Sequence, residues 1–177
     1  MDHDAYTDDY ITRVLNEARV FAFVGASAKS NRPSFFAMKY LLGKGYTVHP
    51  VNPGQAGQPI LGQMTYAKLA DVRAPVDVVD VFRNSEAALE ITRDAIRLKD
   101  QLGIKFVWMQ LGVRNDEAAR EAEAVGLQVV MNRCPKIEYG KLSGEWGWVG
   151  GNSGMISSKK QSLHGSGKMQ SLGIVKR

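Results

Sequence analysis

Short apolar runs alternate with amphipathic segments along most of the chain. Five runs are rich in β-branched or aromatic residues and are bounded by turn residues, which predicts buried strands. They are Val20–Val24, Thr47–Val51, Val76–Phe82, Lys105–Met109 and Leu127–Met131. Because helical patterns separate them, we expect an α/β fold with a doubly wound, Rossmann-like parallel sheet of about five strands in a single domain.

Capping residues and helical spacing predict the segments between the strands. We expect helices over 7–18, after Pro33, near Thr65–Asp71, from Ser85 to Gly103 and from Asn115 to Gly126. Ser85 and Asn115 have side chains that accept hydrogen bonds from a first helical turn. Phe36, Tyr40 and Leu41 recur at helical spacing after Pro33, and Gly43 or Gly45 can end that helix.

The periodic pattern ends after Tyr139, and residues 150–173 are rich in Gly, Ser, Lys and Gln. We expect residues 1–149 to form the domain and residues 150–177 to form a basic tail that is mobile or docks on a protein partner. The net charge of +5 belongs to this tail, because residues 1–150 hold 18 basic and 18 acidic side chains. A nucleic-acid partner is not expected, since the body carries no excess of positive charge.

The same composition suggests a compartment. Every apolar run is shorter than the ~20 residues that a membrane span needs. The N-terminal segment is acidic and has no apolar core of a secretory signal. Cys134 is the single cysteine, so no disulfide can form within the chain. We therefore expect a cytoplasmic protein with no membrane partner.

The segment Val20–Ser34 carries the most chemical information. It predicts a buried strand, a glycine turn, a polar loop and a helix that begins at Pro33, a layout that offers backbone N–H groups and a helix N-terminus to an anion. The guanidinium of Arg32 can bond phosphate oxygens there, although a solvated loop arginine is the alternative. The candidate residues of this loop are Gly25, Ala26, Ser27, Lys29, Arg32, Pro33 and Ser34.

The loop lacks the features of the common nucleotide motifs. No second or third glycine follows Gly25, and the second strand ends in Val51, Asn52 and Pro53 without an acid for ribose hydroxyls. A Walker loop is also absent. No histidine, cysteine or carboxylate cluster indicates a metal or an acid–base pair, and Asp77 and Asp80 fall on opposite faces of one strand as structural acids.

The carboxyl ends of parallel strands meet at one edge of the sheet, where ligands bind. Beyond the first loop, these ends deliver Val51, Asn52, Pro53, Phe82, Arg83, Gln110, Leu111 and Cys134. Two interpretations of Cys134 stay open. It is a small packing residue, or it is a thiol beside the ligand that forms a mixed disulfide.

Five segments together resemble the CoA-binding domain family, whose members are similar to the N-terminal CoA-binding domain of the succinyl-CoA synthetase α-subunit. The segments are Val24–Ser27 with Arg32–Ser34, Gly45–Gly54, Val76–Arg83, Trp108–Val113 and Asn132–Tyr139. The resemblance implies that CoA or an acyl-CoA lies across the carboxyl edge. Its phosphates would meet Gly25–Ser27 and Arg32, its adenosine and pyrophosphate would meet Val51–Pro53 and Phe82–Arg83, and its pantetheine would approach Met109–Leu111.

Two departures limit what the resemblance implies. The synthetase's phosphohistidine lies in a second domain that this sequence lacks, and Gln55 stands where the synthetase has a lysine. We therefore expect a CoA-binding module without catalysis of its own, acting as a carrier, a sensor or a partner subunit. An NAD(P)-binding oxidoreductase domain and a subunit of an acyl-CoA ligase are the alternatives.

Overall fold

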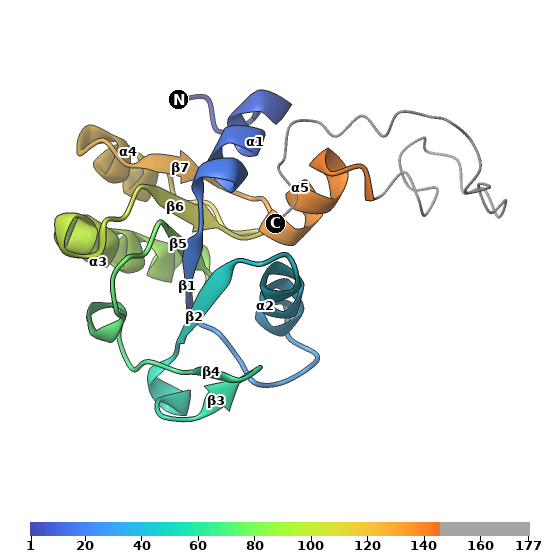
Figure 1. Cartoon of the computed structure of the whole chain (residues 1–177). Helices are drawn as coiled ribbons and strands as arrows, with labels where there is room; N and C mark the ends of the chain where they lie inside the picture. The colour runs from blue at the N-terminus through green and yellow to red at the C-terminus, as the bar shows by residue number, and fades with distance from the viewer. Residues whose placement is uncertain (146–177) are drawn as a thin grey trace, which may run out of the picture.

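A five-stranded parallel sheet forms the centre of the molecule in the computed structural model, which describes residues 1–145 (Figure 1). Its strands are β1 (Val20–Val24), β2 (Thr47–Val51), β5 (Val78–Val81), β6 (Phe106–Met109) and β7 (Gln128–Val130). They run in the order β2-β1-β5-β6-β7, and every neighbouring pair is parallel. The predicted fold class is confirmed. The chain changes direction across the sheet between β1 and β5, which is the switch point where such sheets bind ligands.

Helices cover both faces of this sheet (Figure 1). One face carries α1 (Asp8–Glu17), α2 (Pro33–Gly43) and α5 (Pro135–Leu142), and the other carries α3 (Ser85–Leu102) and α4 (Asp116–Ala124). Alternate residues of each strand enter the two cores. Phe21 and Phe23 pack under α1 and α2, whereas Ala22 packs with the α3 side. The central strands β1, β5 and β6 are thus buried on both faces, which explains their nearly continuous apolar sequences.

The helix boundaries follow local capping chemistry. The Thr7 Oγ1 accepts a hydrogen bond from the Tyr10 amide at 3.2 Å, and the Asn115 Oδ1 accepts one from Ala118 at 2.9 Å. The expectation that Ser85 caps α3 is wrong by one residue. Asn84 is the cap, and the Ser85 Oγ accepts a hydrogen bond from the Arg114 amide instead.

The connection between β2 and β5 differs most from the sequence expectation. The helix expected near Thr65–Asp71 is a single 3₁₀ turn, η2 (Leu69–Asp71), and another such turn, η1 (Pro53–Gln55), follows β2. A small antiparallel hairpin of β3 (Pro59–Ile60) and β4 (Gln63–Met64) lies between them. Two-residue strands are too short to show a periodic pattern, so the sequence could not indicate them.

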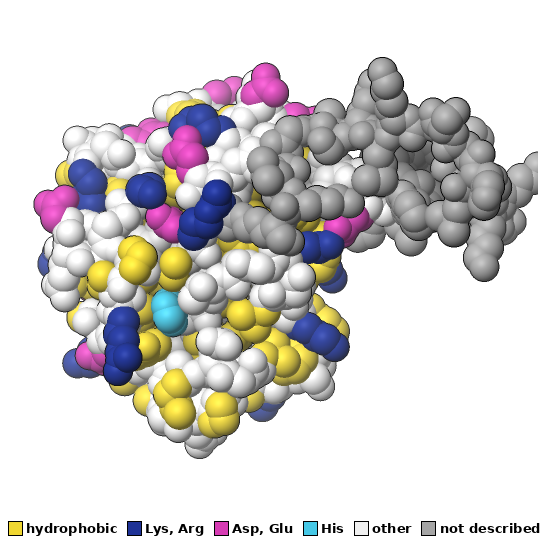
Figure 2. All heavy atoms as spheres, viewed as in Figure 1, with side chains coloured by type: hydrophobic (Ala, Val, Ile, Leu, Met, Phe, Trp, Pro, Cys, Tyr) yellow, Lys and Arg dark blue, Asp and Glu magenta, His cyan; other side chains and the backbone are white. Residues whose placement is uncertain are grey.

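Charged side chains of both signs are interspersed on the face of the described body drawn in Figure 2. Within residues 1–145, no helix has the length and apolar character needed to cross a membrane. The basic tail expected over residues 150–177, with its possible docking role, lies outside the described residues.

Candidate functional site

Two cavities open at the carboxyl edge of the sheet, where the sequence places its candidate residues. The first has a volume of about 780 Å³ and the second about 730 Å³. Gly25 and Arg83 line both of them. These residues follow β1 and β5, so the two cavities meet at the switch point of the sheet.

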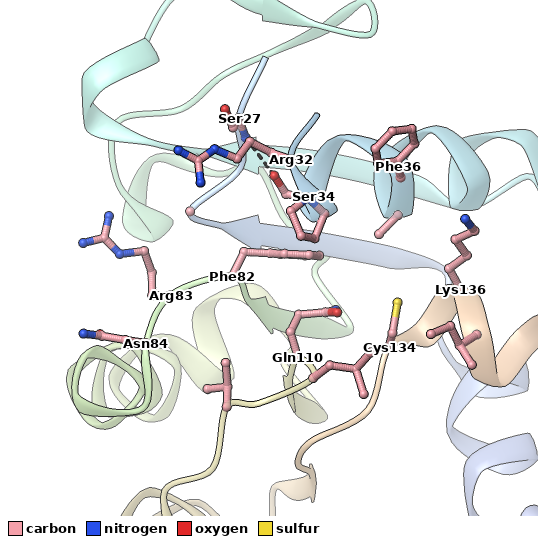
Figure 3. Close-up of a pocket in the computed structure, with 16 residues that line it drawn as sticks. Ser27, Arg32, Ser34, Phe36, Phe82, Arg83, Asn84, Gln110, Cys134 and Lys136 are labelled. Atoms are coloured by element: carbon pink, nitrogen blue, oxygen red, sulfur yellow. Dashed lines mark hydrogen bonds between the residues drawn. The ribbon is translucent and has the colours of Figure 1, made fainter. Parts of the chain in front are cut away.

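Most of the predicted site residues line the first cavity, which Figure 3 shows in close-up. They are Gly25, Ser27, Arg32, Pro33, Ser34, Phe82, Arg83, Gln110, Leu111 and Cys134. Three more, Val51, Asn52 and Pro53, line the second cavity. The remaining candidates line neither cavity: Ala26 and Met109 are buried in the core, and Lys29 is exposed on the loop.

The structure adds residues that the sequence analysis missed. Around the first cavity these are Phe36, Ala37, Asn84, Val113, Lys136 and Ile137, and η2 and α3 supply much of the second. The helix expected after Pro33 is α2, on which Phe36 is 51% exposed while Met38 and Leu41 are buried. Nothing local in the sequence separates Phe36 from the buried apolar residues of the same helix, so its position at the cavity could not be predicted.

The turn after β1 depends on a glycine. Gly25 has φ +92°, which other residues rarely adopt. A Cβ atom here would lie 2.7 Å from the Phe82 carbonyl oxygen and 2.9 Å from Cδ of Arg83. The absent side chain therefore lets the ends of β1 and β5 approach each other between the two cavities.

The backbone amides of the first loop are less available than the sequence suggests. The Ser27 amide donates to Ser34 Oγ at 3.1 Å, the Ala28 amide to Gln55 Oε1 at 3.0 Å, and the Lys29 amide to Ser27 Oγ at 3.3 Å. These three N–H groups therefore have partners within the protein, and anion binding by the loop stays a prediction. The three acceptors lie in the same loop, at the start of α2 and in η1, and these hydrogen bonds hold the loop in shape.

Asn52 joins the ends of two strands. Its Nδ2 donates to the Ala26 carbonyl at 2.7 Å, and its Oδ1 accepts from the Gly54 amide at 2.9 Å. Both ends of the amide are occupied within the protein. Asn52 therefore braces the loop after β1 against the turn after β2, in addition to lining the second cavity.

The first cavity has a marked charge asymmetry. Arg32, Arg83 and Lys136 line it, and no acidic side chain of the described residues does. Figure 3 shows the three basic groups on different sides of the cavity. The second cavity is mixed, because Glu90 and Asp94 line it together with basic residues. An anionic ligand is therefore favoured at the first cavity and at the junction of the two.

A carboxyl and a thiol lie deep in this region. Asp80 is fully buried, and burial raises its pKa well above the ordinary value. Gln110 Nε2 donates to both of its oxygens, at 2.8 and 2.9 Å. Burial also raises the pKa of the half-buried Cys134 thiol, and the nearby Asp80 carboxyl raises that pKa further. Cys134 thus favours the neutral thiol over the reactive thiolate, and its proposed mixed disulfide stays a prediction.

Asp77 has a structural role, as expected. It lies on the opposite strand face to Asp80 and accepts hydrogen bonds from the Arg19 and Val20 amides at 2.8 and 3.0 Å. Lys105 Nζ donates to its other oxygen at 2.8 Å. Although burial opposes ionisation, these partners hold the pKa of Asp77 below its usual range.

Comparisons with known proteins identify the family of the chain. The model of the CoA binding domain matches residues 19–140. The protein YneT of Bacillus subtilis (strain 168) is 29% identical over 129 residues, which cover 73% of this chain and 91% of YneT. A hypothetical protein from Pyrococcus horikoshii OT3 is 36% identical with a TM-score of 0.72, over 80% of this chain and 96% of that one.

A larger enzyme contains a similar unit. The dinucleotide forming acetyl-coenzyme A synthetase 1 from Ca. Korarchaeum cryptofilum, in complex with phosphate and ADP, is 25% identical with a TM-score of 0.56. The match covers 71% of this chain and 28% of the synthetase chain. With its fold, its strand-end segments and a family match over most of its length, the chain belongs to the CoA binding domain family.

Proposed function

We propose that the protein binds CoA or an acyl-CoA across the carboxyl edge of its sheet, with the ligand extended through both cavities. The observation that carries this proposal is the junction of the cavities at Gly25 and Arg83, beside a cavity with three basic and no acidic side chains. CoA is a long, multiply anionic molecule with a nucleotide at one end and a largely uncharged pantetheine arm at the other. Its chemistry matches a charged junction flanked by two cavities.

The lining residues suggest a direction for the ligand. The pyrophosphate lies nearest Arg32, Arg83 and the N-terminus of α2, where opposite charge and the helix dipole favour it. The adenosine occupies the second cavity beside Val51 and Pro53. The pantetheine arm occupies the first cavity, whose floor carries Gln110.

We propose further that the module binds its ligand without chemistry of its own, as a carrier, a sensor or a partner subunit. Among the described residues that line the two cavities there is no histidine, and the one thiol has a raised pKa. We expect acetyl-CoA to survive incubation with the protein unhydrolysed. Release of free thiol above the background rate, followed with a chromogenic disulfide, would contradict this proposal.

Calorimetry with CoA, dephospho-CoA and NADH tests the binding proposal. We expect CoA to bind, dephospho-CoA to bind more weakly because it lacks the 3′-phosphate, and NADH to bind weakly or not at all. Binding of NADH with no response to CoA would favour an NAD(P)-binding oxidoreductase domain instead. Mass spectrometry of the ligand that co-purifies with the protein gives an independent result without an assumed ligand.

Arginine variants locate the site. We expect Arg32→Ala and Arg83→Ala each to weaken CoA binding by roughly tenfold to a hundredfold, the range for a lost hydrogen bond to a charged group. Arg13→Ala is the matched control, because it removes the same charge from α1 beside Gln128, at the amino end of β7. Equal affinity in Arg32→Ala and Arg13→Ala would remove Arg32 from the site.

The synthetase comparison favours a second candidate, a subunit of an acyl-CoA ligase completed by another chain. The observation is that this chain matches only 28% of the synthetase chain. A pull-down from the native cell identifies associated chains. ATP-dependent formation of acyl-CoA by the reconstituted pair, and not by either chain alone, would support the ligase function over a free-standing carrier.

A further inference from the structure

Asp80 is a buried carboxyl whose hydrogen bonds in the described part of the chain come from a side chain of the candidate site. It lies in the middle of β5, paired in register with Phe23 of β1 and Trp108 of β6, and its side chain is 0% exposed. Trp108 does not donate a hydrogen bond to Asp80, because its indole Nε1 donates to the Arg133 carbonyl. The carboxyl oxygens accept hydrogen bonds from Gln110 Nε2. A buried carboxyl is costly, and this one contacts a residue of the candidate site.

Asp77 provides an internal comparison on the neighbouring segment. It is held by the Lys105 ammonium and by the amides of Arg19 and Val20, so it joins β1, β5 and β6 at the amino edge of the sheet. Asp80 has neither a basic partner nor a backbone donor among its hydrogen bonds in the described part of the chain. Its hydrogen bonds therefore fix the orientation of the Gln110 side-chain amide.

The Gln110 side chain has one donating and one accepting end. Its Nε2 faces Asp80, at 2.8 and 2.9 Å from the two carboxyl oxygens. Gln110 is 7% exposed and lines the first cavity, and Figure 3 shows its amide end between Phe82 and Cys134. Its Oε1 accepts no hydrogen bond from the described residues. The ionised form of Asp80 only accepts hydrogen bonds, and the neutral form still accepts through its carbonyl oxygen, so the contact of Nε2 with both oxygens holds Nε2 toward Asp80 and leaves Oε1 toward the cavity.

We propose that Asp80 is a positioning residue, which fixes the Gln110 amide so that its carbonyl oxygen accepts a hydrogen bond from the ligand in the first cavity. This inference rests on the proposed function, in which the donor is an amide N–H of the pantetheine arm. The opposite orientation would present an NH₂ group and would favour anionic oxygens. With its NH₂ group turned toward Asp80, Gln110 presents a carbonyl oxygen to the cavity and favours the uncharged arm. Arg32, Arg83 and Lys136 favour the phosphates, so the cavity distinguishes the two parts of the ligand.

The test compares two ligands, CoA and adenosine 3′,5′-bisphosphate, which lacks the pantetheine arm. Calorimetry is run on the wild type, Asp80→Asn, Gln110→Met and the double variant. Asparagine is nearly isosteric with aspartate but sets one donor and one acceptor against Gln110 Nε2, so it removes the orientational preference. Asp77→Asn is the matched control, since it alters a buried carboxyl that lines neither cavity.

We expect Gln110→Met to weaken CoA binding by about tenfold and Asp80→Asn by about threefold to tenfold, the range for one lost hydrogen bond. Binding of the bisphosphate should stay within about twofold in both variants. The double variant should bind CoA no more weakly than Gln110→Met, because Asp80 acts through Gln110. Asp77→Asn should leave the ratio of the two affinities unchanged.

Three results would overturn the inference: unchanged CoA affinity in Asp80→Asn, equal losses for both ligands, or additive losses in the double variant. These differ from failure of the proposed function. If wild-type protein binds neither ligand, the CoA proposal itself fails. If the wild type binds both ligands and Asp80→Asn shows no selective loss for CoA, only the role of Asp80 fails.

Discussion

Gly25→Ala is expected to destabilise the protein at the junction of its two cavities. The substitution adds one methyl group at a residue with φ +92°, in a space bounded by the backbone of Phe82. The new Cβ would lie 2.7 Å from the Phe82 carbonyl oxygen, which belongs to the chain leaving β5 and cannot rotate away as a side chain can. The end of β1 must therefore move away from Phe82 and Arg83.

Two costs set the magnitude. Holding an alanine in a left-handed conformation costs about 1–2 kcal/mol, and overpacking against fixed atoms costs about 1–3 kcal/mol more. The sum of roughly 2–5 kcal/mol is a large part of the 5–15 kcal/mol that stabilises a typical domain. For a chain of this size it corresponds to a fall in Tm of about 5–15 °C. We expect the same displacement to move Arg83 and thereby to weaken the proposed binding of CoA.

Gly43→Ala is the matched control. Gly43 is the last residue of α2, its φ is not positive, and an added Cβ would meet nothing within 4 Å. This substitution is expected to leave the free energy of unfolding unchanged or to raise it by up to about 1 kcal/mol, because alanine favours a helix. Urea unfolding followed by far-UV circular dichroism compares the two variants. Equal midpoints for Gly25→Ala and Gly43→Ala would refute the argument from close approach.

Further predictions concern titratable groups. Burial raises the folded-state pKa of Asp80, which destabilises the folded protein near pH 7. Asp80→Asn should therefore raise the free energy of unfolding near pH 7. This gain should vanish below about pH 4, where the carboxyl is neutral in both states. Asp77→Asn should instead cost about 1–3 kcal/mol near pH 7, and the cost should shrink as the pH falls through the lowered folded-state pKa of Asp77. Urea unfolding of the wild type and both variants across pH checks these predictions. A change in the free energy of unfolding with the same sign in both variants near pH 7 would contradict them. At pH 8 a thiol-reactive disulfide should modify Cys134 more slowly than free cysteine, and saturating CoA should slow it further; Cys134→Ser gives the background.

Local sequence predicted the elements because burial on both faces leaves a strong pattern. Val20–Val24 and Thr47–Val51 are found with the predicted bounds, while the three later strands are shorter than expected. Sequence gave no sign of the β3–β4 hairpin, whose two-residue strands carry no period. Capping was predictable to within one residue, since Asn84 and Ser85 both have side chains suited to a helix start.

The candidate site was predictable in part, because parallel strands bring their carboxyl ends to one edge whatever their order. Gly25, Arg83 and Gln110 could therefore be named from the sequence, and all three line the first cavity. Phe36 and Lys136 could not be assigned to the cavity, since they reach it from helices whose rotation depends on packing. Ligand contacts at all of these residues stay predictions.

The sequence by itself determined the alternation of strands and helices, the glycine at the end of β1 and the chemical types at the strand ends. These are local properties, set by burial periodicity and backbone conformation. Only the tertiary structure decided that β1 and β5 are neighbours, that Ser34 and Gln55 occupy the loop amides, and that Asp80 faces Gln110. Each of those pairings joins segments separated along the chain, so packing rather than local sequence decides it.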